Sequence, residues 1–564
     1  MKQHSTTIPD EIVVEFPTGE TARFAVGTPV SSVLDFFRTD GHPVDHDEAI
    51  AVAVNNEITS LTYPIDTNAT VRPITLHDPE GVRIYRRSLC FLASAAIAVV
   101  DSDRKIVIGH SLGDGYVYYS EDDSPIEASF LKRLEDTMRE LIDADLAIVR
   151  RVMSYTDALA YFTSADQRGT IHLLEHNNRA RIPVHSLGAY TDLSHGPVVP
   201  TTGILRYFEI KPYSPGFILR YPPESDPTAI RAFRDSEMLS SIYQEYRSWG
   251  KILGIRSVGD LNNHVVENRI TEFVRVAETL HNKKIAEIAD RIAQRSDEVR
   301  IVLIAGPSSS GKTTFTKKLA IQLQVLGFRP VTINLDDYFV PRELTPLDEN
   351  GRWDFESINA IDIALLNEHL LGLFDGKTID IPSFDFKTGS RREGGRSLAL
   401  PNQSILLMEG IHGLNPELTP RIAQSAKYTV YVSALTQLNI DDHNRISTTD
   451  NRLIRRLVRD HQFRGHDALT TLTMWPSVRR GENRNIFPFQ DTADSAFNSA
   501  LDYELGVLKN YASPILKHVK PHHDVYNEAT RLLRFLENFV RIPEKIAPPD
   551  SILREFIGDS GFKY

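Results

Sequence analysis

Cysteine is nearly absent from the sequence, which has a single one, Cys90, in 564 residues. A lone thiol excludes an intramolecular disulfide and every zinc site that is built from several thiolates. Cys90 lies in an apolar run, so we expect a small buried hydrophobe. A chain of this length with one thiol fits the reducing cytoplasm best.

Long hydrophobic runs are missing as well. The longest, residues 90–100, is about half of the ~20 residues that a membrane-spanning helix needs. The opening MKQHSTTIPDEIVVEF has carboxylates where a signal peptide has an apolar stretch. We therefore expect neither secretion nor insertion into a membrane.

Positive charge is in deficit, because 63 Lys and Arg stand against 75 Asp and Glu, for a net charge of -12. Such a surface does not attract nucleic acid or anionic lipid as a whole, so any phosphate-binding site must be local. The sequence also has no internal repeat and no low-complexity segment. Its 41% hydrophobic and 24% charged residues are typical of a soluble globular protein and argue against disorder.

The length predicts three to four domains at about 150 residues each, so no single module accounts for the chain. Short apolar runs and turns at the front predict a β-grasp-like α+β unit, followed by a second α+β unit with helices near 85–100 and 125–148. Helix formers then predict a helical connector, after which strands alternate with amphipathic helices. The expected units are 1–76, 77–225, 226–297 and 298–545, with a short peripheral tail at 546–564.

The fourth unit has the alternation of an α/β fold with a parallel sheet. Its predicted strands are RIVLIAG, PVTINL, SILLMEG and KYTVYVSA, and its predicted helices include one from Lys312 and a long one near 493–519. The predicted fold class is therefore multidomain, with two α+β units and a helical connector in front of an α/β domain. In such a sheet, ligands bind at the C-terminal ends of the strands.

The segment GPSSSGKTT lies between the strand IVLIA and a helical pattern that stops at Gly327. It fits GxxxxGK(S/T), in which backbone N–H groups at a helix N-terminus wrap a polyphosphate, a lysine reaches the β and γ oxygens, and a hydroxyl binds magnesium. The alternative is a glycine-rich turn that binds nothing. We predict ATP and Mg2+ as cofactors, with Lys312 catalytic and Thr313 on the metal. The predicted nucleotide-binding residues are Gly306, Pro307, Ser308, Ser309, Ser310, Gly311, Lys312, Thr313 and Thr314.

Carboxylates end two of the predicted strands. Asp336 follows PVTINL, where it would face the phosphates and accept a hydroxyl proton. The alternative for Asp336 is a magnesium contact through water or a cap on the strand. Glu409 ends SILLMEG, where it could hold magnesium directly or through water, unless it is a buried structural glutamate.

Four arginines recur on one face of a predicted helix. They are spaced i, i+3, i+4 and i+7, and apolar residues fill the positions between them. Guanidinium groups in one stripe repel each other unless an anion arrives, so we expect a lid that closes over transferring phosphates. An ordinary solvated basic face is the alternative. The four are Arg452, Arg455, Arg456 and Arg459.

From about 300 to 540, the ordered motifs GPSSSGKTT, LDDYF, WDFES, IPSFDF, LLMEGIHG and DNRLIRRLVRDHQFRG resemble the uridine kinase and phosphoribulokinase family. The resemblance implies that Asp336 is the general base toward a sugar 5'-hydroxyl and that Asp354 binds the nucleoside ribose. It also implies catalytic lid arginines at Arg452, Arg455 and Arg459. The further substrate-binding residues that it implies are Asp336, Tyr338, Phe384, Arg391 and Arg452.

The segment IPSFDFKTGSR departs from that family. Uridine–cytidine kinases usually carry Tyr and His at the positions that are Phe384 and Gly389 here. Loss of these polar contacts to the base should reduce discrimination between nucleosides. The phosphoryl-transfer residues are therefore better supported than the identity of the acceptor.

The front half resembles threonyl-tRNA synthetase. Residues 11–75 are similar to its TGS domain, and HSLGDGYVYY with YTDLSHGPVVPTTG is similar to its second additional domain, which edits mischarged tRNA. Editing there uses four metal-type ligands, of which one soft ligand remains, so we expect a retained fold without the chemistry, serving RNA binding, regulation or assembly. His110 and His195 are expected to be hydrogen-bonded structural residues. The four matching positions are Arg86, Cys90, Ser194 and Val198.

The leading prediction is an ATP- and magnesium-dependent kinase that transfers the γ-phosphate to the 5'-hydroxyl of a nucleoside, a pyrimidine nucleoside on the resemblance. One alternative is a kinase for a sugar phosphate such as ribulose 5-phosphate, which would want an additional cationic pocket. Another is a tRNA- or ribosome-associated ATPase whose front half contacts RNA, although the acidic charge argues against it. A degenerate scaffold is disfavoured, because loop, base, magnesium carboxylate and lid are all present.

Overall fold

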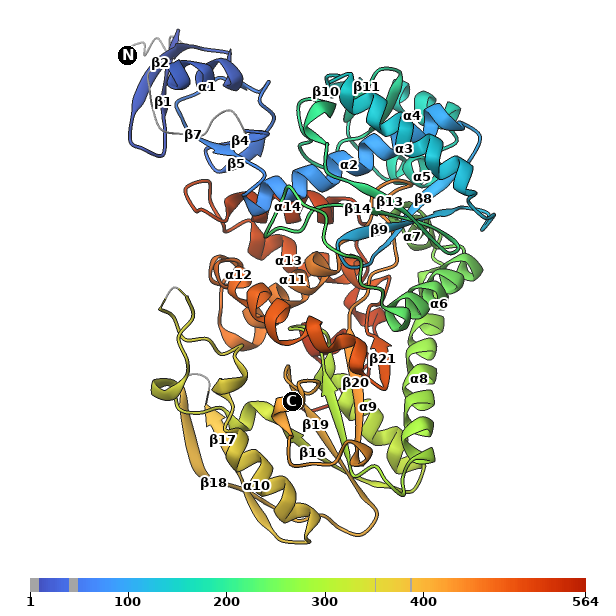
Figure 1. Ribbon diagram of the computed structural model, residues 1–564, viewed down its shortest axis with the longest axis vertical. Helices are drawn as coiled ribbons and strands as arrows, with labels where there is room; N and C mark the ends of the chain where they lie inside the picture. The colour runs from blue at the N-terminus through green and yellow to red at the C-terminus, as the bar shows by residue number, and fades with distance from the viewer. Residues whose placement is uncertain (1–9, 40–48, 350, 386–387, 564) are drawn as a thin grey trace, which may run out of the picture.

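A computed structural model describes residues 10–39, 49–349, 351–385 and 388–563 of the protein. Two α+β units lie at one end and a parallel sheet with its helices at the other, so the predicted fold class is confirmed (Figure 1). Among the described residues, no helix is long and apolar enough to cross a membrane.

In its described residues, the first unit has a five-stranded mixed sheet, a separate pair of short strands, β3 and β6, and one helix. Its elements are β1 (Glu11–Glu15), β2 (Thr21–Ala25), β3 (Thr28–Pro29), α1 (Val30–Thr39), β4 (Ala51–Val54), β5 (Glu57–Thr59), β6 (Pro64–Ile65) and β7 (Ala69–Ile74). The strand order is β2-β1-β7-β4-β5, and β1 and β7 run parallel. Strand alternation turns Ile12 and Val14 inward, where they share a small core with Val33 of α1.

The second unit combines two antiparallel sheets, ordered β10-β11-β12 and β13-β14-β9-β8, with four helices among its described residues. Its elements are α2 (Pro79–Val100), β8 (Ile106–Ser111), β9 (Gly115–Ser120), α3 (Ala128–Asp143), β10 (Val149–Ser154), α4 (Tyr155–Ser164), α5 (Arg168–Glu175), β11 (Arg181–Leu187), β12 (Tyr190–Leu193), β13 (Glu209–Tyr213) and β14 (Gly216–Arg220). Leu89 and Leu92 of α2 share a core with Phe130 and Leu134 of α3. The two helices predicted in this region are α2 and α3.

The predicted helical connector contains three helices, α6 (Glu237–Leu253), α7 (Val258–Val266) and α8 (Ile270–Gln294). Ser257 and Asp260 begin α7 with a reciprocal capping box. Helix α8 is more than a connector, because its Phe273, Ile285 and Ile292 lie in the hydrophobic core of the parallel sheet. Its apolar face is buried against the α/β domain.

The α/β domain is built on five parallel strands in the order β16-β19-β15-β20-β21, with a separate hairpin of β17 and β18. All five residues of β15 are buried, as a strand covered on both faces requires. The C-terminal ends of the five strands meet at one edge of the sheet. The elements are β15 (Ile301–Ala305), α9 (Lys312–Val325), β16 (Arg329–Asn334), α10 (Ile363–Phe374), β17 (Ile379–Asp385), β18 (Ser390–Leu398), β19 (Ser404–Glu409), β20 (Lys427–Ser433), α11 (Thr448–Arg459), α12 (Ala468–Asn485), β21 (Ser495–Asn498), α13 (Glu504–Leu516), α14 (Tyr526–Glu537) and α15 (Arg554–Ile557).

The prediction of one long helix near 493–519 is wrong. The segment contains strand β21, which pairs in parallel with β20, and helix α13 begins only at Glu504. Phe497 of β21 packs on Phe315 of α9 and on His281 of α8. Tertiary packing at the edge of the sheet therefore outweighs the local helical pattern.

The prediction of a peripheral tail is also wrong. Ile552, Leu553 and Phe556 are at most 1% exposed and belong to the same core as Phe315 of α9. Residues 544–563, called the C-terminal segment below, therefore close one side of the α/β domain. Burial of these apolar side chains stabilises the segment where the composition alone suggested a loose end.

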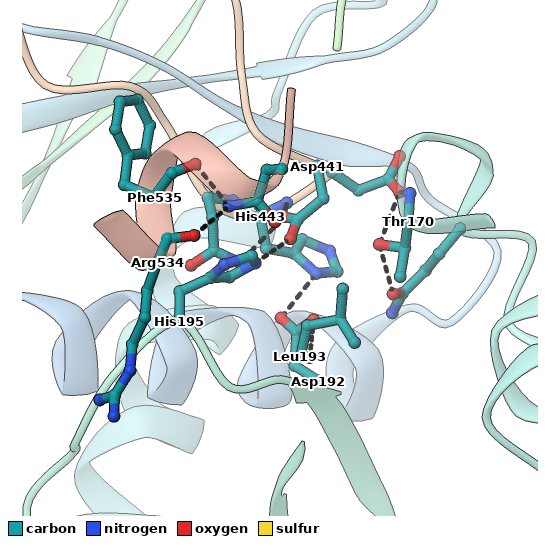
Figure 2. Close-up of polar contacts among 12 residues, drawn as sticks. Thr170, Asp192, Leu193, His195, Asp441, His443, Arg534 and Phe535 are labelled. Atoms are coloured by element: carbon teal, nitrogen blue, oxygen red, sulfur yellow. Dashed lines mark hydrogen bonds and ion pairs between the residues drawn. The ribbon is translucent and has the colours of Figure 1, made fainter. Parts of the chain in front are cut away.

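One turn of the α/β domain, residues 441–443, enters the second α+β unit and is called the contact turn below (Figure 2). Asp441 lies 2.6 Å from Nε2 of His195, and the carboxylate of Asp442 accepts the backbone N–H of Thr170 at 2.9 Å. Asp441 is buried, so its pairing with His195 offsets the cost of removing a charge from water.

The third residue of the contact turn, His443, completes this interface. Its Nδ1 is 3.0 Å from Oδ2 of Asp192, and the hydroxyl of Tyr190 lies close to both side chains. Burial alone would lower the pKa of His443, but Asp192 raises it to about 9. Ser447 then caps helix α11, so the interface leads directly into the helix that carries the four arginines.

Candidate functional site

The loop between β15 and α9 has a backbone path that depends on glycine at two positions. A Cβ at Gly306 would collide with the carbonyl oxygen of Val432, and Gly311 has a φ of 81°. The loop leads to the N-terminus of α9, whose first N–H groups have no partners within the helix. These N–H groups and the positive end of the helix dipole form a site suited to a phosphate.

Lys312, the first residue of α9, folds back over the loop. Its ammonium donates to the carbonyl oxygens of Gly306 at 2.9 Å and Pro307 at 3.1 Å. Burial lowers the pKa of Lys312, and nearby carboxylates, Glu409 foremost, oppose that shift. The positive charge is therefore held against the loop by fixed acceptors.

Thr313 and Glu409 meet at the same edge of the sheet. The Thr313 hydroxyl donates to Oε1 of Glu409 at 2.8 Å, and the register places Glu409 beside Ile304 of β15. Burial raises the pKa of Glu409 to about 7, although Lys312 lowers it. The two predicted metal ligands are therefore adjacent, and both present oxygen.

The donor set of this pair fits magnesium. Within the described part of the chain, no group of three or more His, Cys, Asp or Glu side chains could hold a metal ion by itself. Magnesium is usually bound by one or two protein oxygens, with phosphate oxygens and waters completing its octahedron. Thr313 and Glu409 are the residues that would hold it here.

Asp336 lies just beyond β16, in a short 3-10 helix, with its N–H bonded to Oδ1 of Asn334 at 3.0 Å. Burial raises the pKa of Asp336, whereas the positive charges of Lys312, Arg464 and Arg459 lower it. The structure thus brings the predicted base into the electrostatic range of the loop lysine. A carboxylate in such surroundings suits the acceptance of a hydroxyl proton.

Each of the four arginines predicted for the lid has a carboxylate partner within the chain, so the stripe is neutralised without a bound anion, and the lid itself stays a prediction. Arg452 is 2% exposed and forms a two-pronged pair with Glu482, whose Oε1 also accepts the N–H of Ser308 at 3.0 Å. Arg452 itself donates to the carbonyl oxygen of Ser308 at 3.2 Å. The pair therefore holds the phosphate-binding loop by its backbone.

Two further arginines of α11 hold the same loop. Arg455, which is 0% exposed, pairs with Glu504 and donates to the carbonyl oxygen of Ser309 at 3.4 Å. Arg456 donates to the hydroxyl of Ser308 at 2.8 Å. These contacts make α11 a support beneath the loop. We call Arg452, Arg455, Arg456, Glu482 and Glu504 the loop clamp.

Arg459 differs from the clamp residues. It pairs with Asp460 at 2.9 Å, and with Arg464 it lowers the pKa of Asp336. Among the arginines predicted for the lid, Arg459 is therefore the one whose charge acts on the predicted base. A role for it toward transferring phosphates stays a prediction.

Two predicted substrate contacts have structural partners. Tyr338 is 0% exposed, and its hydroxyl lies 3.0 Å from Nδ1 of His369. Phe384 is also buried, with its ring centroid 5.5 Å from that of Phe339. Both side chains pack the core beside β16, and the structure does not present them as open binding groups.

The other two acceptor-side residues also have partners. Arg391 donates to Oδ2 of Asp362 at 2.9 Å, and Oδ1 of Asp354 accepts the N–H of Glu356 at 3.1 Å. Burial, and next the charge of Glu482, raise the pKa of Glu356 to about 7, while Lys312 is among the charges that lower it. Asp354 therefore lies in a turn with Glu356, whose carboxyl is close enough to the loop for the charge of Lys312 to act on it.

Four glutamates near the loop were not predicted from the sequence. Glu482, Glu504 and Glu356 come from segments that are distant in sequence, and no local pattern marks them. Glu555 accepts both the N–H and the hydroxyl of Thr314, at 3.0 and 2.7 Å. The sequence does contain a signal for the burial of the segment that carries Glu555. Its apolar residues Ile552, Leu553, Phe556 and Ile557 have the spacing of a helix with one buried face.

The positions that match editing ligands form a packed region in the second α+β unit. The guanidinium of Arg86 lies 4.4 Å over a tyrosine ring, and the hydroxyl of Ser194 is 2.9 Å from Nε2 of His185. Cys90, which is only partly buried, lines a cavity of about 20 Å³ with Val198 and the contact turn. A cavity of this size holds about one water molecule.

The two histidines expected to be structural have partners. His110 is stacked on Tyr243 with 4.0 Å between ring centroids, and its Nδ1 is 2.8 Å from the hydroxyl of Tyr119. Burial lowers the pKa of His110 to about 3. His195 is bound to Asp441 of the contact turn.

The comparisons agree with this geometry at the level of the class. A glycine-dependent loop, a lysine, a Thr–Glu pair and a parallel sheet define the C-terminal part as a P-loop kinase fold. Residues 301–504 match the Phosphoribulokinase / Uridine kinase family. This part of the chain is therefore a domain of that family.

The N-terminal part matches other proteins. A threonine–tRNA ligase of Desulforamulus reducens is 30% identical over 200 residues, which are 35% of this chain and 31% of the ligase. The chain thus spans about a third of the length of the curated relatives that it matches.

Solved structures also match part of the chain. One described as a "Possible Uridine Kinase" from Bacillus stearothermophilus is 18% identical, with a TM-score of 0.25, and the match covers 38% of this chain and 100% of that one. A D-glycerate 3-kinase from Cryptococcus neoformans var. grubii is 13% identical, with a TM-score of 0.22, covering 45% and 87%.

Proposed function

We propose that the protein is an ATP-dependent nucleoside kinase that transfers the γ-phosphate to the 5'-hydroxyl of a nucleoside, a pyrimidine nucleoside in the first place. The observation that carries the proposal is the meeting of Thr313, Glu409, Lys312 and Asp336 around one loop. The family name covers uridine kinases and so supports this acceptor class.

The chain's residues divide the reaction among them. N–H groups of the loop and the ammonium of Lys312 bind the phosphates and offset the negative charge that develops during transfer. Asp336 accepts the hydroxyl proton of the acceptor. Magnesium, held by Thr313 and Glu409, would neutralise charge on the phosphate oxygens. The loop clamp keeps the backbone N–H groups in place, which is the positioning that such a reaction needs.

A sugar-phosphate kinase remains the alternative within enzymes. A phosphorylated acceptor needs cationic side chains, and the acceptor-side Arg391 is already paired with Asp362. This pairing favours an acceptor without a phosphate.

For the N-terminal half, we propose an assembly role in place of editing. The cavity beside Cys90 is small and is lined in part by the contact turn. The similarity to threonine–tRNA ligases supports RNA contact as the rival role. The cytoplasm, which supplies ATP and keeps a lone thiol reduced, is the proposed location.

Purified protein with ATP, magnesium and a panel of nucleosides and sugar phosphates tests the proposal. We expect a nucleoside monophosphate, and we expect Lys312→Ala to lower kcat at least about a hundredfold, because the charge held against the loop is lost. Lys377→Ala, on an exposed lysine beyond α10, is the matched control and should retain full activity.

Turnover of sugar phosphates alone would replace the acceptor class with the alternative. No product from any acceptor would contradict the kinase assignment. ATP hydrolysis that rises when RNA is added would favour an RNA-associated ATPase.

A further inference from the structure

The first turn of α9 already binds an anion from this chain. Oε2 of Glu555 accepts the backbone N–H of Thr314 at 3.0 Å and its hydroxyl at 2.7 Å. Thr314 directly follows Lys312 and Thr313, so its N–H is one of those that α9 leaves unpaired within the helix. A carboxylate and a phosphate oxygen accept hydrogen bonds at such a place in the same way.

The charge around the loop supports competition between the two anions. Glu409, Glu555 and Asp336 are, in this order, the carboxylates that raise the pKa of Lys312 against the effect of its burial. A polyphosphate that binds this loop brings further negative charge to the same place. Repulsion by the Glu555 carboxylate would then weaken its binding.

The backbone that carries Glu555 is firmly held. Ile552 lies against Gly311, since a Cβ on this glycine would be 2.5 Å from Cγ2 of Ile552. The guanidinium of Arg455 is 5.0 Å from the ring centroid of Phe556. Lys318 of α9 donates to Oδ2 of Asp550 at 3.0 Å. The segment itself is therefore fixed in the core.

The side chain of Glu555 can exchange with a ligand while its backbone stays in place. Glu555 is partly exposed, whereas its neighbours Arg554 and Phe556 are buried. A rotation of its side chain would release Thr314 without unpacking the C-terminal segment. In this exchange Thr314 loses its two hydrogen bonds to Glu555, and its N–H and hydroxyl can donate equivalent ones to a phosphate oxygen.

We propose that Glu555 is a determinant of donor affinity, a carboxylate that occupies the Thr314 end of the phosphate-binding loop and must turn away before a nucleotide binds. The inference rests on the proposed function in one respect, which is that the loop binds a nucleoside triphosphate. It makes no use of the acceptor. Glu555 therefore holds the affinity for the donor below the value that the loop alone would give.

Calorimetric titration of the full chain with ATP and magnesium, without an acceptor, tests this inference. Glu555→Ala should lower the Kd for ATP about tenfold to a hundredfold, because it removes a charge-assisted competitor. Glu555→Gln should give an intermediate gain, since the amide oxygen still reaches Thr314 but carries no charge. Asp559→Asn, an equal charge change on an exposed residue of the same segment, should leave the Kd unchanged.

An unchanged or higher Kd in Glu555→Ala would overturn the inference, the higher value showing that Glu555 orders Thr314 for the nucleotide. Absence of ATP binding in all variants would overturn it too, because the alanine variant exposes the loop. Thermal unfolding without ligand shows that each variant is folded. If ATP binding tightens as expected and no nucleoside is phosphorylated, the proposed function fails while this inference stands.

Discussion

At the scale of single residues, Glu482 decides how the phosphate-binding loop is held. Its carboxylate accepts the N–H of Ser308 and at the same time neutralises Arg452, and both side chains are almost fully buried. A charged pair in the core is costly to form but far more costly to break, because the remaining charge has no partner. Glu482 is therefore a positioning residue for the loop, although it lies on α12.

Glu482→Ala should lower the free energy of unfolding by about 3–5 kcal/mol, since it leaves the Arg452 guanidinium buried and unpaired. Urea unfolding measures the loss. Glu349→Ala, which breaks exposed pairs with Arg480 and Arg484, should cost less than about 1 kcal/mol. Equal losses in the two variants would contradict the role of the clamp.

The double variant Arg452→Met with Glu482→Leu separates charge from packing. It removes both charges together and should recover much of the stability that Glu482→Ala loses. The double variant still lacks the acceptor for the Ser308 N–H. We therefore expect it to bind ATP more weakly than the wild type even where its stability is restored.

At the scale of elements, the C-terminal segment was predicted to be peripheral and is part of the core. Its apolar residues enter the core that α9 and α13 share, and its short helix α15 carries Glu555 to the loop. Phe556 contributes a whole buried ring to this packing. The segment is thus part of the α/β domain.

Phe556→Ala should lower the free energy of unfolding by about 3–5 kcal/mol through the cavity that it leaves. Phe463→Ala, on a ring that is 56% exposed, should change stability by no more than about 0.5 kcal/mol. Thermal and urea unfolding measure both. A loss of free energy of unfolding below about 1 kcal/mol in Phe556→Ala would contradict the place of the segment in the core.

The sequence predicts what is local in this site. The path from Gly306 to Thr313, the strand ends at Asp336 and Glu409 and the parallel sheet all follow from patterns within a few residues. The partners of the α11 arginines do not, because Glu482 and Glu504 come from other elements and only folding brings them near. The prediction of a helix at 495–498 is wrong for the same reason, since the pairing of this strand with β20 outweighs its local helical pattern.

At the scale of the whole molecule, the contact turn joins the two halves. Asp441, Asp442 and His443 each bind a group of the second α+β unit, and the turn leads into α11. Helix α14 adds a second connection, since its Glu528 pairs with Arg83 of α2 at 3.1 Å and its Arg531 pairs with Asp450 of α11. The front half is thus fixed next to the helix that holds the loop.

The interface should depend on pH through His443. Its folded pKa of about 9 lies above the ordinary value of about 6.5, so its pairing with Asp192 stabilises the protein fully below pH 6.5 and ceases to do so as the pH rises through 9. His443→Gln should therefore lower the Tm at pH 6.5 and have little effect near pH 10.

The groups around His443 sharpen that test. Asp192, Asp442 and Asp441 all raise the pKa of His443, while His195 is bound to Asp441. The difference in Tm between wild type and His443→Gln isolates the His443 contribution. A difference that is constant from pH 6.5 to 10 would contradict the ion pair.

The central claim is that the loop, Lys312 and Asp336 transfer a phosphoryl group to the 5'-hydroxyl of a nucleoside. Phosphorus-31 NMR of the product formed from uridine, ATP and magnesium tests it most directly. The account predicts a uridine 5'-monophosphate resonance that grows with the wild type and is absent with Asp336→Asn. Release of inorganic phosphate alone, or equal product with Asp336→Asn, would contradict it.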